Sequence, residues 1–194
     1  PTGGVLAYHG GPDGNHSANK VVYYHDAGLG SAPPGSAFKP YVLAAALTQT
    51  LKKQSKKPVT IDSYVNGSYC VSIEGTKICN DPSDAGVSGP SVTIANAMKY
   101  SLNTTFDQLA YQAGPSNVAN TAHAMGIRKT DAYGNPLLTD KAGTTAFGIG
   151  IGDYPVSPID QAVGFATFAS GGIRHQSYFV AQATDSNGNV VYKH

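Results

Sequence analysis

A serine and a lysine at helical spacing are the residues of this chain best suited to covalent chemistry. Ser36 and Lys39 follow a Pro-Pro-Gly sequence at positions 33–35, and the apolar pattern beyond them predicts a helix that begins here. In the first turn of a helix the backbone N–H groups are unpaired and can stabilise an oxyanion. Lys39 falls on the same face, and an amine shielded from water can take the serine proton. The alternative is a helix-capping Ser36 beside a solvated Lys39.

The Ser-x-x-Lys pattern is short, and it occurs a second time at Ser17 and Lys20. That copy stands in a polar loop with no apolar helix to bury a lysine or to present a helix N-terminus. We therefore expect Ser17 and Lys20 to take no part in catalysis.

A second polar pair, Ser101 and Asn103, stands in the short joint between two predicted helices. A hydroxyl there can relay a proton to a leaving group, and an amide can hold a substrate carbonyl. The alternative is structural, with Ser101 ending one helix and Asn103 capping the next. Together with Ser36 and Lys39, this pair forms a candidate catalytic set that is more informative than either pair alone.

Helical periodicity, caps and glycine stops predict the helices that position these residues. The first helix covers 36–57, with apolar residues at helical spacing until Pro58 and with Lys52 and Lys53 in its last turn. Further helices are expected at 92–98 behind a Ser91 or Thr93 cap, from Asn103 or Thr104 to Gly114, from Ser116 to Gly126, and from Ser157 and Pro158 to Gly171 and Gly172.

Short apolar runs at 5–8, 178–183 and 190–192 indicate strands, and a turn at 185–189 joins the last two into a hairpin. No internal repeat is present. The chain is accordingly divided into a first strand and loop at 1–35, the nucleophile helix at 36–57, a strand and loop insertion at 58–90, a helical subdomain at 91–172 and a return hairpin at 173–194.

Two cysteines, Cys70 and Cys79, flank two short β runs that meet at Glu74 and Gly75. This spacing predicts a disulfide that staples a hairpin. The alternative is two separate buried thiols. A metal site is disfavoured because no histidine stands at ligand spacing nearby.

The composition excludes some classes of function. Thirteen Lys and Arg residues against twelve Asp and Glu residues give a net charge of +1, and only Lys52, Lys53, Lys56 and Lys57 are clustered, so nucleic-acid binding is not expected. No apolar run approaches the roughly 20 residues that cross a bilayer. Only 13% of residues are charged, which is typical of proteins outside the cytoplasm.

Other candidates favour structural roles. His9, His16 and His25 lack a fourth donor and are expected to be solvated loop residues instead of metal ligands. The glycine-rich run at 147–152 has no strand before it and no helix directly after it, so it is not interpreted as a nucleotide-binding loop. We expect its backbone to pack closely behind a cleft between the subdomains.

Three stretches, at 33–40, 92–104 and 156–172, have the residue types and the order found in the penicillin-binding transpeptidases, the serine acyl-transferases of peptidoglycan synthesis. The chain resembles this family over nearly its whole length. The opening Gly-Val-Leu-Ala-Tyr-His-Gly-Gly at 4–11 is more similar to the bifunctional class A enzymes, which carry a glycosyltransferase domain upstream, than to the monofunctional class B enzymes.

The resemblance implies the α/β (α+β) fold of penicillin-binding and β-lactamase-like proteins, in which helices flank an antiparallel sheet beside a helical subdomain. It implies a D,D-transpeptidase in which Ser36 attacks the penultimate D-Ala of a stem peptide, Lys39 accepts its proton, Ser101 relays a proton to the leaving D-Ala and Asn103 orients the substrate. β-Lactams would acylate Ser36. No cofactor or metal is implied, and the expected location is extracytoplasmic, with a membrane anchor outside these residues.

One departure concerns the third motif of the family, Lys-Thr-Gly or Lys-Ser-Gly on an inner strand, which this sequence lacks. The most similar sequence starts at Lys141. It comes before the helix end at Gly171 and Gly172, whereas the family's third motif comes after that helix, so we interpret Lys141 as a loop residue. We expect the chain to be an incomplete transpeptidase domain whose last helix and strands belong to a missing segment or to another chain.

Two other function classes stay open. One is a relative that hydrolyses instead of cross-linking, either a D,D-carboxypeptidase or a β-lactamase. The other is a non-catalytic module that binds penicillin or the cell wall. Acylation by penicillin distinguishes them: a transpeptidase releases the acyl group slowly, a β-lactamase releases it quickly, and a non-catalytic module is never acylated.

Overall fold

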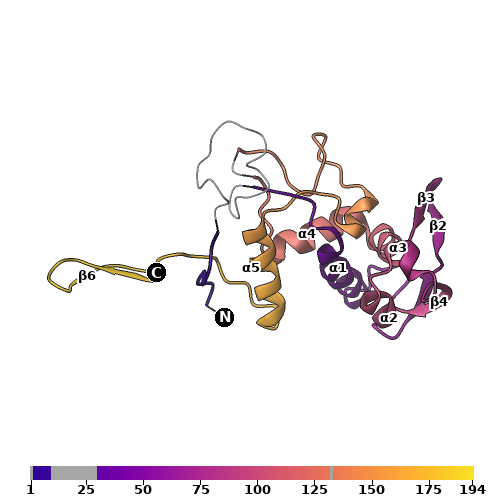
Figure 1. Ribbon diagram of the computed structural model, residues 1–194, viewed down its shortest axis with the longest axis horizontal. Coiled ribbons are helices and arrows are strands. Elements are labelled where there is room, and N and C mark those ends of the chain that lie inside the picture. The colour runs from indigo at the N-terminus through magenta and orange to yellow at the C-terminus, as the bar shows by residue number, and fades with distance from the viewer. Residues whose placement is uncertain (1, 10–29, 132) are drawn as a thin grey trace.

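The computed structural model describes residues 2–9, 30–131 and 133–194 (Figure 1). In chain order its helices and strands are the 3-10 helix η2 (Gly35–Phe38), α1 (Lys39–Leu51), β1 (Tyr64–Gly67), β2 (Cys70–Ile73), β3 (Thr76–Cys79), the 3-10 helix η3 (Pro82–Asp84), β4 (Gly89–Thr93), α2 (Ile94–Lys99), α3 (Asn103–Ala113), α4 (Pro115–Met125), the 3-10 helix η4 (Phe147–Ile151), α5 (Pro158–Ala169), β5 (Gln182–Thr184) and β6 (Val190–Lys193). Strands β2 to β4 lie at one end of the molecule, and the β6 hairpin extends away from the opposite side (Figure 1).

Helix α1 lies in the middle of the core because its apolar residues recur at helical spacing. Phe38, Tyr41, Val42 and Ala45 are fully buried, and α1 packs against α3 and α4. Lys39 is the first residue of α1 and is also buried, with 1% of its surface exposed. The packing of α1 therefore holds a lysine side chain inside the protein.

The predicted C-terminal end of this helix was wrong. Helix α1 ends at Leu51, and Lys52 is its C-cap residue and not part of its last turn. Lys53 adopts a positive φ of 55°, and the N–H of Gln54 donates back to the carbonyl of Gln49. The chain turns away from the helix axis at this point, well before Pro58.

In the part of the chain that the structure describes, the strands form three antiparallel ribbons of two strands each, β1 with β4, β2 with β3 and β5 with β6. The predicted mixture of helices and antiparallel strands is confirmed. The described strands do not join into the single antiparallel sheet that the resemblance implies, because each ribbon pairs only within itself. The C-terminal hairpin is present, with a first strand shorter than predicted.

The strand predicted at 5–8 does not form in the described residues. Between residues 2 and 9, the structure has a parallel bridge that pairs Gly4 with Tyr178. It consists of a hydrogen bond from the Val5 N–H to the Tyr178 carbonyl and another from the Tyr178 N–H to the Gly3 carbonyl. One bridge is too short to make a ladder, so the short apolar run at 5–8 was not by itself enough to predict a strand.

The caps predicted for α3 and α4 were also wrong. Leu102 occupies the N-cap position of α3, and neither Asn103 nor Thr104 caps it. The Asn80 side chain, from 24 residues earlier, accepts the Thr104 N–H at 2.9 Å. Helix α4 begins at Pro115 after a glycine N-cap and not at Ser116.

The remaining helix boundaries agree more closely with expectation. Thr93 caps α2 by accepting the Asn96 N–H, while Val92 belongs to β4 and not to the helix. Ser157 caps α5 and Pro158 is its first residue, as predicted. Proline suits this position because its missing N–H would have no partner there.

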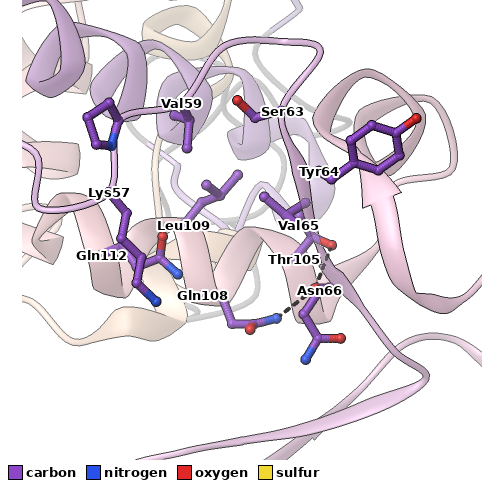
Figure 2. A pocket seen from close by; sticks show the side chains of 11 residues that line it. Lys57, Val59, Ser63, Tyr64, Val65, Asn66, Thr105, Gln108, Leu109 and Gln112 are labelled. Atoms are coloured by element: carbon purple, nitrogen blue, oxygen red, sulfur yellow. Dashed lines mark hydrogen bonds between the residues drawn. The ribbon is translucent and has the colours of Figure 1, made fainter.

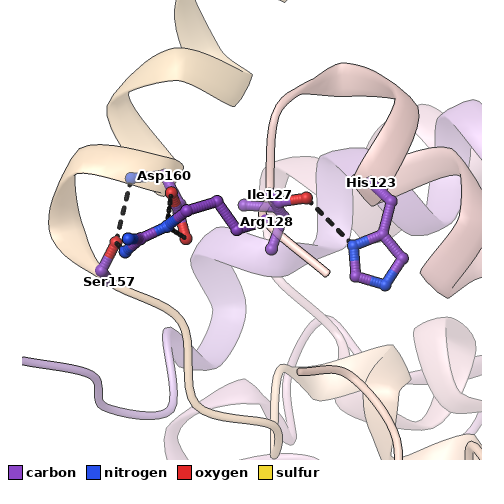
Figure 3. Close-up of polar contacts among 5 residues, drawn as sticks. All are labelled: His123, Ile127, Arg128, Ser157 and Asp160. Carbon is purple, nitrogen blue, oxygen red and sulfur yellow. Dashed lines mark hydrogen bonds and ion pairs between the residues drawn. The ribbon is translucent and has the colours of Figure 1, made fainter. Parts of the chain in front are cut away.

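A polar contact connects the segment after α4 to the start of α5 (Figure 3). The Nε of Arg128 donates to the two carboxylate oxygens of Asp160 at 2.8 and 3.1 Å, and its Nη2 donates to the Ser157 hydroxyl at 3.0 Å. The side chain of Asp160 is 5% exposed. One N–H shared between two carboxylate oxygens, together with the Nη2 bond to Ser157, joins the Arg128 side chain to the first turn of α5 and holds α5 against the helical centre.

Candidate active site

The four residues of the predicted catalytic set lie together, joined by one amine. The Nζ of Lys39 donates to the Ser36 hydroxyl at 3.0 Å, to the Ser101 hydroxyl at 2.9 Å and to the Asn103 side-chain oxygen at 2.7 Å. It also contacts the backbone carbonyl of Ser101. Residues from η2, α1, the α2–α3 joint and α3 therefore converge on a single nitrogen.

Ser36 and Lys39 have opposite exposure. Ser36 is exposed at the surface, whereas Lys39 lies beneath it and is buried. The ring of Phe106 lies under the amine, with its centroid 5.7 Å from Nζ. The serine is accessible to a ligand, and the lysine is shielded from water on its other sides.

Burial changes the proton affinity of this amine. The pKa of Lys39 falls from 10.5 to about 8, mainly because burial disfavours the charged form. The negative charges of Asp107 and Asp84 act in the opposite direction and limit the decrease. At neutral pH the amine is consequently much closer to its neutral form, in which it can accept a proton, than an exposed lysine is.

The backbone at Ser101 explains how its side chain reaches the lysine. Helix α2 ends in a Schellman motif, in which the N–H of Leu102 donates to the Ala97 carbonyl and the N–H of Ser101 donates to the Met98 carbonyl. Ser101 has a φ of 57°, in the position that glycine usually takes. A serine in the left-handed region costs about 1 kcal/mol or more. This geometry directs both the hydroxyl and the carbonyl of Ser101 at Lys39.

The turn that carries Ser36 packs against the predicted glycine-rich run. Gly35 donates its N–H to the Gly152 carbonyl at 3.3 Å. A Cβ at Gly152 would lie 2.2 Å from the Gly35 carbonyl oxygen, so no other residue fits there. The run at 147–152 forms η4 and the residue after it, which agrees with its interpretation as close backbone packing.

The model of the penicillin binding protein transpeptidase domain family matches residues 1–194 of this chain. The chain belongs to the penicillin-binding protein transpeptidase family. Penicillin-binding protein 1A of Mycolicibacterium smegmatis is 32% identical to it over 195 residues, which cover 98% of this chain and 22% of that protein. Penicillin-binding protein 1A of Mycobacterium tuberculosis is 34% identical over 197 residues, covering 98% of this chain and 21% of that protein.

Solved structures agree with this assignment. The penicillin-binding protein PonA1 from Mycobacterium tuberculosis superposes with a TM-score of 0.80 at 31% identity, covering 99% of this chain and 45% of that chain. The complex of PonA1 with penicillin V gives a TM-score of 0.74, covering 87% of this chain and 43% of that one. The family and fold that the sequence resemblance implied are confirmed. This transpeptidase-family chain spans about a fifth of the length of the curated relatives it matches.

Other predicted residues of the transpeptidase-family chain lie away from the amine. Lys141 is an exposed residue of a turn, as predicted. Cys70 and Cys79 stand opposite each other on the β2–β3 ribbon and are joined by a disulfide bond. Ser17, Lys20, His16 and His25 lie outside the described residues, whereas His9 is described and is exposed.

Sequence reasoning missed two buried polar residues beside the site. Asn80 caps α3 next to Asn103, and Asp107 lies one helical turn after Asn103. The spacing of Asp107 from Asn103 was a signal that could have found it, because residues four apart share a helix face. Nothing in the local sequence identifies Asn80, since its partner is 24 residues away.

A separate cavity of about 420 Å³ lies between β1 and another face of α3 (Figure 2). Its lining includes Lys57, Tyr64, Gln108 and Gln112, and none of the four site residues. Gln108 spans its edge by donating to the Asn66 carbonyl at 2.8 Å.

Within the described residues, no group of three His, Cys, Asp or Glu side chains is placed to hold a metal ion. In the same part of the chain, no helix has the length and apolar character needed to span a membrane.

Proposed function

We propose that this chain carries the acylation centre of a D,D-transpeptidase that cross-links peptidoglycan stem peptides and reacts with β-lactams. The observation that carries this proposal is the single buried amine that contacts the hydroxyls of Ser36 and Ser101 and the amide oxygen of Asn103. An exposed hydroxyl hydrogen-bonded to a buried amine whose pKa is lowered to about 8 is the arrangement that nucleophilic catalysis needs.

In the proposed first half-reaction, the Ser36 oxygen attacks the carbonyl carbon of the penultimate D-Ala, and its proton passes to Lys39 Nζ. The tetrahedral intermediate collapses as the bond to the terminal D-Ala nitrogen breaks. The leaving amine takes a proton from Lys39 through the Ser101 hydroxyl, which lies 2.9 Å from Nζ. None of the described residues accepts a hydrogen bond from the Ser36 N–H, so this group is available to the oxyanion.

In the second half-reaction, an amine from a neighbouring stem peptide attacks the ester carbonyl. Lys39 accepts the proton of that amine and returns it to the Ser36 oxygen as the ester bond breaks. The side-chain N–H₂ of Asn103 points to the substrate amide in this proposal, because its oxygen is already used by Lys39. A β-lactam follows only the first half, since its opened ring stays attached to Ser36.

The proposal has three further parts. Lys-Thr-Gly or Lys-Ser-Gly, the third motif of the family, is not in this sequence, and we propose that a further segment or another chain supplies it. The resemblance of residues 4–11 to the class A enzymes supports a bifunctional enzyme with a glycosyltransferase domain. Because peptidoglycan is the substrate, the domain is proposed to work on the outer side of the cytoplasmic membrane.

Labelled penicillin tests this function. On the full-length protein we expect its mass on the peptide that contains Ser36, no adduct after Ser36→Ala, and an unchanged adduct after Ser17→Ala or Lys141→Ala. Ser17→Ala alters the second Ser-x-x-Lys sequence, and Lys141→Ala alters the sequence most similar to the family's third motif. An adduct that persists in Ser36→Ala contradicts the assignment. Rapid release of the acyl group would favour a β-lactamase, and transfer of the donor peptide to water alone would favour a D,D-carboxypeptidase.

A further inference from the structure

A carboxylic acid outside the predicted catalytic set lies beside the lysine. Asp107 projects from the same face of α3 as Asn103, one turn later, and follows Phe106, whose ring lies beneath Lys39. It is 1% exposed, and its Oδ1 has no hydrogen-bond partner among the described residues. A buried carboxyl oxygen without a partner is costly, so its presence calls for a physical reason.

The surroundings of this carboxyl keep water away from it. Gly150 of η4 lies directly against Asp107, and a Cβ at that position would be 2.5 Å from Oδ1 and 2.7 Å from the Phe106 carbonyl oxygen. No space for a side chain remains between η4 and α3. The carboxyl group therefore interacts with its neighbours mainly through its charge, in surroundings where charge acts strongly.

The charges that face the lysine are few among the described residues. Asp107 acts on Lys39 from α3, and Asp84 acts on it more weakly from the end of η3. Asp153, after η4, faces Asp107. Burial raises the pKa of Asp107 to about 7, with Asp153 adding to the increase and Lys39 opposing it. A buried acid and a buried base thus affect each other's ionisation.

We propose that Asp107 is a positioning residue for Lys39: the Asp107 carboxylate stabilises the ammonium formed when Lys39 takes the Ser36 proton, and so sets the strength of Lys39 as a base. This inference rests on the proposed acylation of Ser36. Asp107 acts through charge, because none of the four hydrogen bonds of Lys39 goes to it. It touches no reacting atom and acts only through the lysine.

The test compares Asp107→Asn with the unmodified full-length protein. Asparagine has nearly the same shape and no charge, so it removes the interaction that favours protonated Lys39. The rate of acylation by a fluorescent penicillin is measured from pH 5 to pH 10, together with the titration of Lys39 by NMR of labelled lysine. Asp107→Ala, which cannot collide with Gly150, is the second variant. Asp62→Asn, an exposed substitution with the same change of charge, is the matched control.

In both Asp107 variants, the acylation rate is expected to rise with pH at a midpoint about one pH unit lower than in the unmodified protein. The midpoint of the Lys39 titration should fall by the same amount, since a nearby opposite charge shifts a pKa by about one unit or more. The plateau should fall several-fold, because a weaker base assists less. Asp62→Asn should leave both curves in place. A lower plateau at an unchanged midpoint means that Asp107 is only structural, and it overturns the inference. An absence of any Ser36 adduct in the unmodified protein contradicts the proposed function instead, and the NMR titration still tests Asp107.

Discussion

Replacing Lys39 by arginine tests the proposed base most directly. Arginine keeps the positive charge and can still donate to Ser36 and Ser101, but its guanidinium stays protonated and cannot accept a proton near neutral pH. If Lys39 is only a structural cation, Lys39→Arg should change the rate of acylation little. If Lys39 is the general base, Lys39→Arg should lower that rate strongly.

The size of the effect follows from the pKa of Lys39. With a pKa of about 8 in place of 10.5, the neutral fraction at pH 7 rises from about 1 in 3,000 to about 1 in 10. Burial therefore supplies about 300 times more of the reactive form. General-base assistance contributes about 10²- to 10⁴-fold in rate. Acylation of Lys39→Arg is expected to be at least about 100 times slower than that of the unmodified protein.

The assay is the second-order rate of acylation by a fluorescent penicillin, measured on the full-length protein. In the unmodified protein the rate should rise with pH and level off above about pH 8, because the neutral amine accumulates as pH passes the pKa of Lys39. For Lys39→Arg the acylation rate should no longer rise with pH in this way, and for Lys39→Ala acylation should be slowed to a similar degree. Lys141→Arg makes the same chemical change in an exposed turn and should have no effect. A rate for Lys39→Arg within about threefold of the unmodified protein would refute the assignment of Lys39 as the base.

Three further predictions concern single contacts. Ser101→Ala should slow acylation by about 10²-fold or more through loss of the proton relay, and an unchanged rate measured in the same assay would argue against that role. Intact-mass analysis should show that Cys70 and Cys79 are alkylated only after reduction; replacing both by serine should cost about 2–3 kcal/mol in chain-entropy terms and spare acylation. Asp160→Asn should weaken the contact with Arg128 and lower the free energy of unfolding by about 1–3 kcal/mol in a denaturant titration, whereas a change near zero would mean that the pair does not stabilise α5.

The site was predictable from the sequence to the extent that it depends on local spacing and on family motifs. Ser36 and Lys39 are three residues apart, and any helical turn brings such residues to one face. The start of α1 provides that turn, although Ser36 itself lies in a 3-10 segment. The placement of Ser101 in a joint between helices followed from the helix boundaries around it. Their chemical roles stay predictions until the acylation experiments are done.

The cap of α3 could not be predicted because the residues concerned have partners elsewhere in the fold. Asn103 and Thr104 carry side chains that normally cap helices, but Asn103 accepts a hydrogen bond from Lys39 and Thr104 donates to the Ser68 carbonyl. Asn80 supplies the missing acceptor from the end of the disulfide-bonded ribbon. A local rule assigns a polar side chain to the nearest backbone, whereas tertiary contacts decide which backbone it reaches.

Two glycines, Gly150 in η4 and Gly152 directly after it, pack against the turn that carries the proposed nucleophile and against the neighbour of the proposed base. Gly152 lets the backbone approach the turn that carries Ser36, and Gly150 lets it approach Asp107, which acts on Lys39. Side chains at these two positions would disturb different partners, the nucleophile's turn in one case and the base's neighbour in the other. The alternating glycines therefore have a physical reason beyond flexibility: they allow one short segment to support the nucleophile and the base at once.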